Sequence, residues 1–168
     1  MTEQANPPLA LRPMLPKEAP ALAEIFRKSV MELTGDDYSD SQREAWAAAI
    51  ENEGAFAKRL ARELTIVATL GGAPIGFATL ESADKIGFLY VHPPAAGQGA
   101  GALLTEALER LAAERGAQNL SVDASDTASG FFARRGYIAQ QRNSVRCGGE
   151  WLSNTTMCKP LTERDVVR

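Results

Sequence analysis

The spacing of hydrophobic and polar positions changes along the chain, and each spacing predicts a type of element. Residues 9–14 alternate, which indicates a first strand ended by Pro16. From residue 17 to 33, apolar side chains recur every three or four positions, as on the buried face of a helix. Residues 64–70 and 73–81 are rich in β-forming side chains and flank Gly-Gly, so they predict a β-hairpin.

Further helices are expected between the first helix and this hairpin. Two pairs of residues have the spacing of a capping box: Ser39 with Gln42, and Ser41 with Glu44. The helix that either pair would start carries Trp46, and helical character resumes over residues 55–62. Polar residues 82–85 then turn the chain from the hairpin into the next strand.

The stretch from residue 86 to 116 has the most informative pattern. Residues 88–91 form an apolar run of strand length, and Pro93-Pro94 cannot continue a ladder of hydrogen bonds. Three glycines follow within five residues, at positions 97, 99 and 101. After them apolar residues again recur every three or four positions, in a helix that ends at Gly116.

The last third of the chain predicts a strand, a short helix and a second hairpin. The strand covers residues 119–124, and Ser125 or Asp126 can cap a helix that runs to residue 135. Residues 137–146 and 150–161 form the hairpin, joined across two glycines. No repeat or linker divides the chain, so we expect one domain over residues 9–161, a flexible terminus at 1–8 and a tail at 162–168.

The glycine-rich turn is a candidate anion site. Glycines remove side chains where a ligand has to approach the main chain, and the first N–H groups of a helix have no partner within the helix. These N–H groups point the same way as the positive end of the helix dipole. We therefore expect the turn at residues 97–101 to bind a pyrophosphate.

These residues resemble a known family. Val91-His92-Pro93, followed by Gly97, Gly99 and a Leu-Leu helix, is similar to the coenzyme A motif of the GNAT superfamily of acetyl-CoA-dependent N-acetyltransferases. Ala96 stands where that motif usually has Gln or Arg, which implies weaker binding. Residues 125–137, SDTASGFFARRGY, resemble a second motif of the family, but Phe132 replaces a tyrosine that often protonates the leaving thiolate.

The order of predicted elements matches the GNAT fold from residue 9 to 161. The resemblance implies an α/β (α+β) fold with a mixed, mostly antiparallel sheet of about seven strands flanked by helices. Strands 4 and 5 would be parallel neighbours that splay apart and admit the pantetheine arm of acetyl-CoA. The coenzyme would contact these residues: Leu89, Tyr90, Val91, Gly97, Gln98, Gly99, Ala100, Gly101, Ala102, Ser125 and Phe132.

The implied reaction is direct transfer of an acetyl group to an amine in a ternary complex. Backbone N–H groups near Leu89 or Val91 would bind the thioester carbonyl oxygen. Many relatives carry a carboxylate near position 87, where this chain has glycine, so Asp123 and Glu81 are the candidate bases, acting directly or through water. Ser125 or solvent would protonate the thiolate.

The acceptor pocket is expected in the first helices and the last hairpin. The large amphipathic side chains there are Tyr38, Trp46 and Trp151, each of which could instead pack in the core. His92, the only histidine, lies beside the glycine motif and is a further candidate for the base, but strand alternation points it away from the cleft. The acceptor is a small-molecule or protein amine whose identity stays open, and a homodimer is expected only because dimers are common in the superfamily.

Composition narrows the partners. The chain has 168 residues, 45% of them hydrophobic, and a net charge of -3 without a basic stripe, which argues against a nucleic-acid partner. Cys147 and Cys158 have no neighbours at metal-ligand spacing, so we expect no metal and no disulfide scaffold. The first residues lack the pattern of a signal peptide and no run reaches membrane-spanning length, so a cytoplasmic location is expected.

Two other functions compete with this one. A dinucleotide-binding oxidoreductase would also place glycines after a strand and an acidic residue at the end of the next strand. Its glycines, however, have the spacing G-x-G-x-x-G, whereas those of this chain have the spacing G-x-G-x-G. A coenzyme A-binding sensor or scaffold without catalysis would explain the residues missing at positions 87, 96 and 132.

Overall fold

The computed structural model describes residues 8–162, so most of the expected flexible terminus (1–8) and most of the expected tail (162–168) lie outside the described residues. The strands form one seven-stranded sheet, in the order β1-β2-β3-β4-β5-β7-β6. The elements are β1 (Leu9–Pro13), α1 (Ala19–Leu33), α2 (Asp40–Ala47), η1 (Ala48–Ile50), α3 (Glu53–Arg62), β2 (Leu64–Leu70), β3 (Ala73–Ser82), β4 (Lys85–Val91), η2 (Pro93–Ala95), α4 (Ala100–Glu114), β5 (Asn119–Ser125), α5 (Ser129–Arg134), β6 (Ile138–Cys147) and β7 (Glu150–Pro160).

The mixed sheet confirms the expected fold. Among the described strands, β4 and β5 form the one parallel pair, and all other neighbours are antiparallel. A doubly wound nucleotide-binding sheet would be mostly parallel, so the fold argues against the oxidoreductase reading. The parallel pair is short, because its register covers only Lys85 opposite Ser121 and Ile86 opposite Val122.

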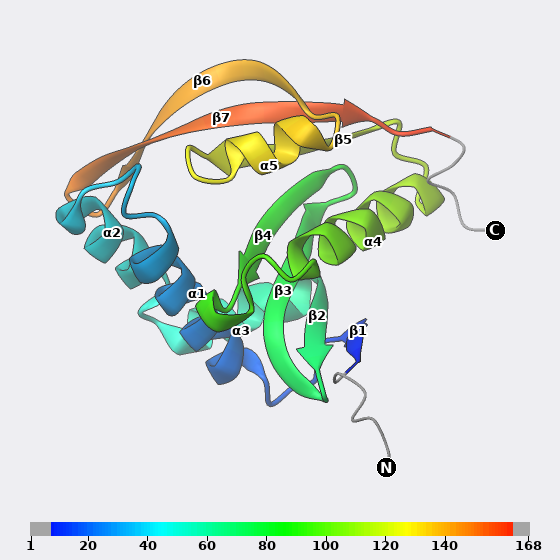
Figure 1. The fold of residues 1–168 in the computed structure, drawn as a ribbon, viewed down its shortest axis with the longest axis horizontal. Coiled ribbons are helices and arrows are strands. Elements are labelled where there is room, and N and C mark those ends of the chain that lie inside the picture. The colour runs from blue at the N-terminus through cyan, green and yellow to red at the C-terminus, as the bar shows by residue number, and fades with distance from the viewer. Residues whose placement is uncertain (1–7, 163–168) are drawn as a thin grey trace, which may run out of the picture.

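Helices cover both faces of the first half of the sheet (Figure 1). One face packs against α1 and α3 around an aromatic cluster in which Phe26, Phe77 and Phe88 are buried. The other face packs against α4, whose Leu104 and Leu108 are fully buried. Burial of such faces is the main source of stability, because apolar area leaves water.

The second half of the sheet consists of β5, β7 and β6. β6 and β7 form a long hairpin that arches over α5, and α2 lies against its far end (Figure 1). Tyr38 ties the halves together: its hydroxyl donates to the carbonyl oxygen of Ser153 at 2.6 Å and accepts from the N–H of Asp126 at 2.9 Å. Burial raises the pKa of Tyr38, so the phenol keeps the proton that it donates.

Helix boundaries follow local capping. Ser39, one of the two expected starts, caps α2 in a full capping box with Gln42, so the alternative start at Ser41 is wrong. The short helix α5 begins at Ser129, later than expected, because the Oγ of Ser125 accepts the N–H of Ala128 in a turn before the helix. Asp126 does not cap it, since its carboxylate binds Arg142.

We predict that Leu104→Ala destabilises the protein by about 2–5 kcal/mol, because the side chain is fully buried and its loss leaves a cavity. Urea unfolding measures the change. Leu15→Ala is the control: that side chain is 52% exposed, and its truncation should cost no more than about 0.5 kcal/mol. Equal costs for the two variants would contradict the assignment of Leu104 to the core.

Candidate functional site

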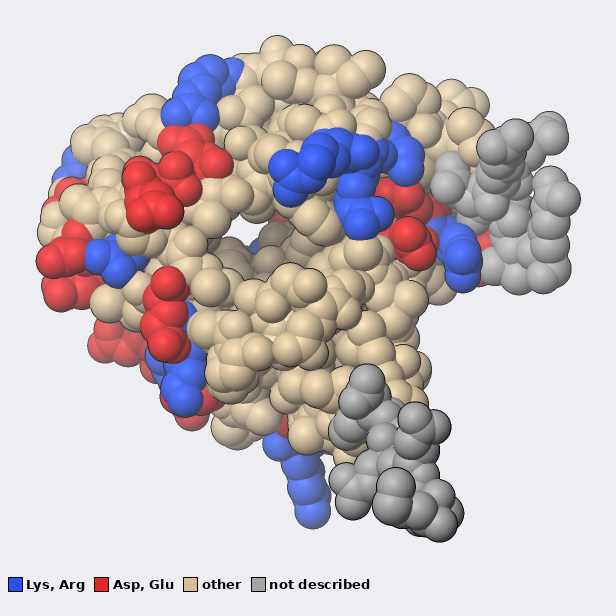
Figure 2. Space-filling model, in the orientation of Figure 1, with Lys and Arg blue, Asp and Glu red and all other residues tan. Residues whose placement is uncertain are grey.

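Two cavities meet where β4 and β5 diverge. The larger, about 510 Å³, is lined by the glycine turn, the start of α4, the end of α1 and one side of α5. The smaller, about 300 Å³, lies between β4, β5 and the β6–β7 hairpin. Leu89, Tyr90, Trp46 and Ser125 line both cavities. Figure 2 shows the molecule hollowed at this place, between α5 and the end of α1.

The glycine turn forms the floor of the larger cavity. Gly97 and Gly99 have φ values of 79° and 94°, in the left-handed region that side chains disfavour. A Cβ built at either position would meet no atom within 4 Å, so the backbone is open to a ligand. Gly99 is the N-cap of α4, which places the free N–H groups of a 15-residue helix at the cavity. The turn therefore has the form of an anion site.

The divergence of the two strands begins at a bulge in β4. Ala78 of β3 pairs with Leu89 and Leu80 pairs with Ile86, so β4 contains one extra residue across Gly87 and Phe88. The N–H of Phe88 donates to Thr79 Oγ1 at 2.9 Å. The Thr79 hydroxyl in turn donates to Glu63 Oε1 at 2.8 Å. A buried hydroxyl and carboxylate thus hold the bulge from behind.

Beyond the bulge, alternate N–H groups of β4 face the gap. The N–H of His92 donates to the carbonyl oxygen of Ile75 on the β3 side, and Tyr90 stands opposite Phe77. Because neighbouring residues of a strand point their N–H groups to opposite sides, those of Leu89 and Val91 point away from β3. Their pairing with β5 has already ended, which leaves these groups free to bind a ligand.

Gly87 lies where relatives often carry a carboxylate, and Glu63 fills the corresponding space. A Cβ at position 87 would lie 2.6 Å from both Glu63 Oε1 and Thr79 Oγ1, and 3.1 Å from Glu81 Cβ. The Glu63 side chain is only 5% exposed, and its Oε2 accepts from Arg59 Nε at 2.5 Å. Glu63 could not be recognised in the sequence, because it lies 24 positions before Gly87 and belongs to no motif.

Asp123 is the one carboxylate among the described residues that line the two cavities. Its Oδ1 accepts from Thr156 at 2.6 Å, and its Oδ2 lies 3.0 Å from Lys85 Nζ. Burial raises the pKa of Asp123, but the hydrogen bonds and the charge of Lys85 outweigh it, so the pKa lies below the ordinary value. The group is ionised at neutral pH and is a weak base.

The other expected catalytic residues are placed differently. Ser125 lines both cavities, and its Oγ accepts from Ala128, which leaves its own proton available for donation. Glu81 does not line either cavity; its carboxylate lies 3.8 Å from both Arg59 and Lys85. It nevertheless neighbours Gly87 across the strands. His92 also lies outside both linings.

Most expected coenzyme contacts line the larger cavity. They are Leu89, Tyr90, Val91, Gly97, Gly99, Ala100, Gly101, Ala102 and Ser125. Gln98 does not, because its amide is exposed and reaches the carbonyl oxygen of Pro94. Phe132 lines the smaller cavity and is 2% exposed in an edge-to-face contact with Tyr137, which agrees with a packing role.

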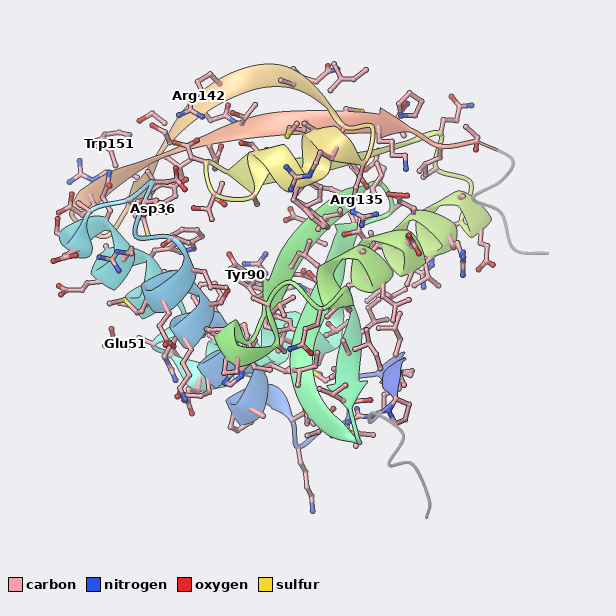
Figure 3. The ribbon with its side chains drawn as sticks, viewed as in Figure 1. Asp36, Glu51, Tyr90, Arg135, Arg142 and Trp151 are labelled. Carbon is pink, nitrogen blue, oxygen red and sulfur yellow. The ribbon has the colours of Figure 1, made fainter. Side chains whose placement is uncertain are left out.

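The expected acceptor residues separate into two groups. Tyr38 and Trp46 line the smaller cavity and stack edge to face, with ring centroids 5.2 Å apart. The ring centroid of Tyr90 lies 6.5 Å from that of Trp46. Tyr90 is central in the molecule, whereas Trp151 lies at the outer end of the β6–β7 hairpin (Figure 3). Trp151 lines neither cavity and is 54% exposed, with the Arg146 guanidinium 5.5 Å from its ring. The structure therefore does not bring Trp151 together with Tyr38 and Trp46.

Two charged side chains and a thiol also line the cavities without having been expected there. Arg146 of β6 lines the smaller cavity. Arg135 of the α5 C-terminus is the one charged residue among the described residues that line the larger cavity. Cys147 lines the smaller one and donates to the carbonyl oxygen of Ala45 at 3.4 Å. Burial raises the pKa of Cys147, which disfavours the reactive thiolate. No group of three His, Cys, Asp or Glu residues in the described part of the chain could hold a metal ion.

Comparison with known proteins agrees with this geometry. Residues 34–159 match the model of an acetyltransferase (GNAT) domain. The uncharacterized N-acetyltransferase YafP of Escherichia coli K12 is 30% identical, over 89% of this chain and 94% of its own. A glycine-rich turn, splayed strands and this match define an acetyltransferase. The chain belongs to the GNAT family.

Solved structures support the same conclusion. A GCN5-related N-acetyltransferase from Rhodopseudomonas palustris is 53% identical and superposes with a TM-score of 0.90, over 96% of this chain and 99% of its own. The PaiA N-acetyltransferase of Thermoplasma acidophilum, solved with coenzyme A, shares the fold with a TM-score of 0.76 at 18% identity, over 91% of this chain and 99% of its own. Within residues 8–162, no helix is long and apolar enough to cross a membrane.

We predict that Gly87→Ala destabilises the protein by about 1–3 kcal/mol, because its methyl group would overlap the Glu63 and Thr79 oxygens that hold the bulge. Urea unfolding measures the change. Gly149→Ala is the matched control, since a Cβ there would meet nothing within 4 Å, and should stay within about 0.5 kcal/mol. A stable Gly87→Ala protein would show that Glu63 and Thr79 can move aside freely.

We also predict a pH dependence for Asp123→Asn. A carboxyl group whose pKa is lowered by folding contributes stability above its unfolded pKa and loses it as the pH falls through the folded pKa. The free energy of unfolding of the variant should therefore be lower than that of the wild type at neutral pH. This difference should shrink once the pH falls below 3.8, the ordinary pKa of an aspartate. Urea unfolding at neutral pH and below pH 3.8 measures the difference. Thr156→Val, which removes one hydrogen bond to Asp123, should show a smaller loss of stability with the same pH dependence. A difference that grows in acid would contradict the lowered pKa.

Proposed function

We propose that the protein transfers the acetyl group of acetyl-CoA to a primary amine by direct attack in a ternary complex. The observation that carries the proposal is the continuity of the two cavities at Leu89, Tyr90, Trp46 and Ser125. A coenzyme in the larger cavity and an amine in the smaller one would meet there. The relative complexed with coenzyme A supports the choice of coenzyme through the shared fold.

Acetyl-CoA fits the residues of the larger cavity. The open backbone at Gly97 and Gly99 and the N-terminus of α4 suit a pyrophosphate. The unpaired backbone of Leu89 and Val91 suits the amides of a pantetheine arm, because both offer strand-like donors and acceptors. The coenzyme supplies an activated thioester, and the chain has to hold the thioester carbonyl in the orientation in which the amine can attack it.

The same N–H groups can stabilise the reaction. An N–H of Leu89 or Val91 would donate to the carbonyl oxygen of the thioester as negative charge develops on it. The bulge at Gly87 and Phe88, held by Thr79, fixes the direction of these donors. Such preorganised donors need no rearrangement at the moment of reaction.

Proton transfer would use Asp123 and Ser125. Asp123 would receive the proton of the amine only in passing, directly or through water, on its way to bulk solvent. Glu81, behind Gly87, is the second candidate and would act through water. The free hydroxyl proton of Ser125 can reach a departing thiolate at the junction of the cavities. Solvent is the alternative donor, since a thiol pKa of about 8.5 makes a dedicated acid helpful but dispensable.

The acceptor would be a small or extended amine flanked by Tyr38 and Trp46. Aromatic faces attract ammonium groups, and the cavity combines these rings with the Asp123 carboxylate. Both features favour a cationic acceptor, whereas the positive charge of Arg146, which lines the same cavity, disfavours one. A sensor or scaffold that binds coenzyme A without turnover is the second candidate, favoured by Gly87 and by the lowered pKa of Asp123.

We predict that acetyl-CoA at about 100 times its dissociation constant raises the melting temperature by about 5–10 °C, since it adds roughly 2.7 kcal/mol to the folded state. NAD should give no shift. Gly99→Asp should abolish the acetyl-CoA shift by placing a negative charge at the pyrophosphate, whereas Gly99→Asn, which has the same shape and tolerates a positive φ, should keep most of it.

Release of coenzyme A in the presence of a panel of amines then separates the two candidates. Amine-dependent release supports the transferase, and binding without release supports the sensor. No thermal shift with acetyl-CoA would contradict both.

A further inference from the structure

The glycine turn of this chain provides no side-chain cation for a pyrophosphate. Ala96, which stands at the usual position of Gln or Arg, lines the larger cavity with a methyl group only. Backbone N–H groups carry partial charges, whereas a pyrophosphate carries full ones. A protein with a net charge of -3 gains little from its overall field, so a local cation matters.

Arg135 lies on the opposite wall of the same cavity. It follows the last residue of α5, on the side of that helix that faces α4 (Figure 3). Its guanidinium carbon lies 4.8 Å from the centroid of the Phe131 ring. That ring lies 3.6 Å from the place of a Cβ on Gly101, in the first turn of α4. Phe131 therefore connects the guanidinium to the glycine turn.

The guanidinium is not fully used by the protein. Arg135 Nε is buried and has no hydrogen-bond partner. Its one ion pair among the described residues is with Glu106, at 3.7 Å from Nη1, and the Glu106 side chain is 51% exposed. An exposed pair at this distance is weak, because water screens it. A buried N–H donor without a partner is costly, so little holds the guanidinium in this position, and turning it toward an anion in the cavity would relieve that cost.

We propose that Arg135 is the cation that pairs with the pyrophosphate of acetyl-CoA, from α5 in place of the missing side chain at position 96. This inference rests on the proposed use of acetyl-CoA. Arginine suits the role, because its planar group can donate two parallel hydrogen bonds to phosphate oxygens. Figure 2 shows basic side chains gathered over α5 at the edge of the hollow.

The neighbouring Arg134 provides a matched control. It carries the same charge one residue earlier and lines a third cavity, of about 270 Å³, which Arg135 and Phe131 also line. It does not line the larger cavity. Its Nη1 lies 3.3 Å from the place of a Cβ on Gly130, so it folds back along its own helix.

The test is calorimetric titration of Arg135→Gln and Arg134→Gln with three ligands: acetyl-CoA, dephospho-CoA, which keeps the pyrophosphate but lacks the 3′-phosphate, and acetyl-pantetheine, which lacks all phosphates. Arg135→Gln should weaken the first two by about 10- to 100-fold, the range expected for hydrogen bonds to a charged group. It should leave acetyl-pantetheine unchanged. Arg134→Gln should change each affinity less than about twofold, because its charge is remote and screened.

Three outcomes would overturn the proposal. Loss of affinity for acetyl-CoA but not for dephospho-CoA would assign Arg135 to the 3′-phosphate. Equal losses in both variants would indicate a diffuse charge effect. Unchanged affinity in Arg135→Gln would leave the backbone as the whole site.

Absence of binding by the wild type would instead contradict the proposed function, and the unliganded melting temperature of each variant identifies a folding defect. Arg135→Lys should recover part of the affinity, because it restores the charge but not the paired donors.

Discussion

The candidate site depends on the early end of hydrogen bonding between β4 and β5. Two residue pairs join these strands, and then they diverge, although both continue for several residues. Divergence leaves strand backbone without partners at the centre of the molecule, which is unfavourable unless water or a ligand satisfies it. The fold thus maintains an unsatisfied edge inside the sheet. That edge is what a pantetheine arm, itself a chain of amides, can complete.

Three separate groups of interactions hold the strands apart. On β4, the bulge is fixed by the bond from Phe88 to Thr79 and by the buried Glu63 carboxylate behind it. On β5, the antiparallel pairing with β7 continues to Ser125 and keeps the strand straight. Between them, Tyr38 connects the loop before α2 to the half of the sheet that contains β5 and β7, through hydrogen bonds to Ser153 and Asp126. Since neither half can close without breaking buried hydrogen bonds, the gap is part of the folded structure.

Much of the fold could be predicted from the sequence, because its signals are local. The Gly-Gly turn, the β-forming side chains of β2 and β3 and the apolar stripe of α4 each depend on neighbouring residues. The glycine turn could be predicted for the same reason. Glu63 and Arg135 could not, because their roles arise from contacts with Thr79 and Phe131 that no sequence spacing encodes. The orientation of Trp151 could not be predicted either, since an aromatic residue in a hairpin can face either side and this one faces solvent.

The lowered pKa of Asp123 restricts how an amine could lose its proton here. A lysine-like ammonium has a pKa of about 10.4, roughly six units above that of an ordinary carboxyl group. A complete transfer between them would cost about 8 kcal/mol or more before the attack begins. Asp123 is moreover held by Lys85, whose own pKa is raised by that bond, and by Thr156.

This carboxylate is therefore better suited to orient the ammonium and the water around it than to take up the proton permanently. The proton would then leave by water to bulk solvent, and the small fraction of neutral amine would attack. Such a mechanism does not require the carboxylate that many relatives place near position 87. A glycine there is compatible with catalysis, and it makes room for the Glu63 carboxylate that holds the bulge next to the proposed oxyanion donors.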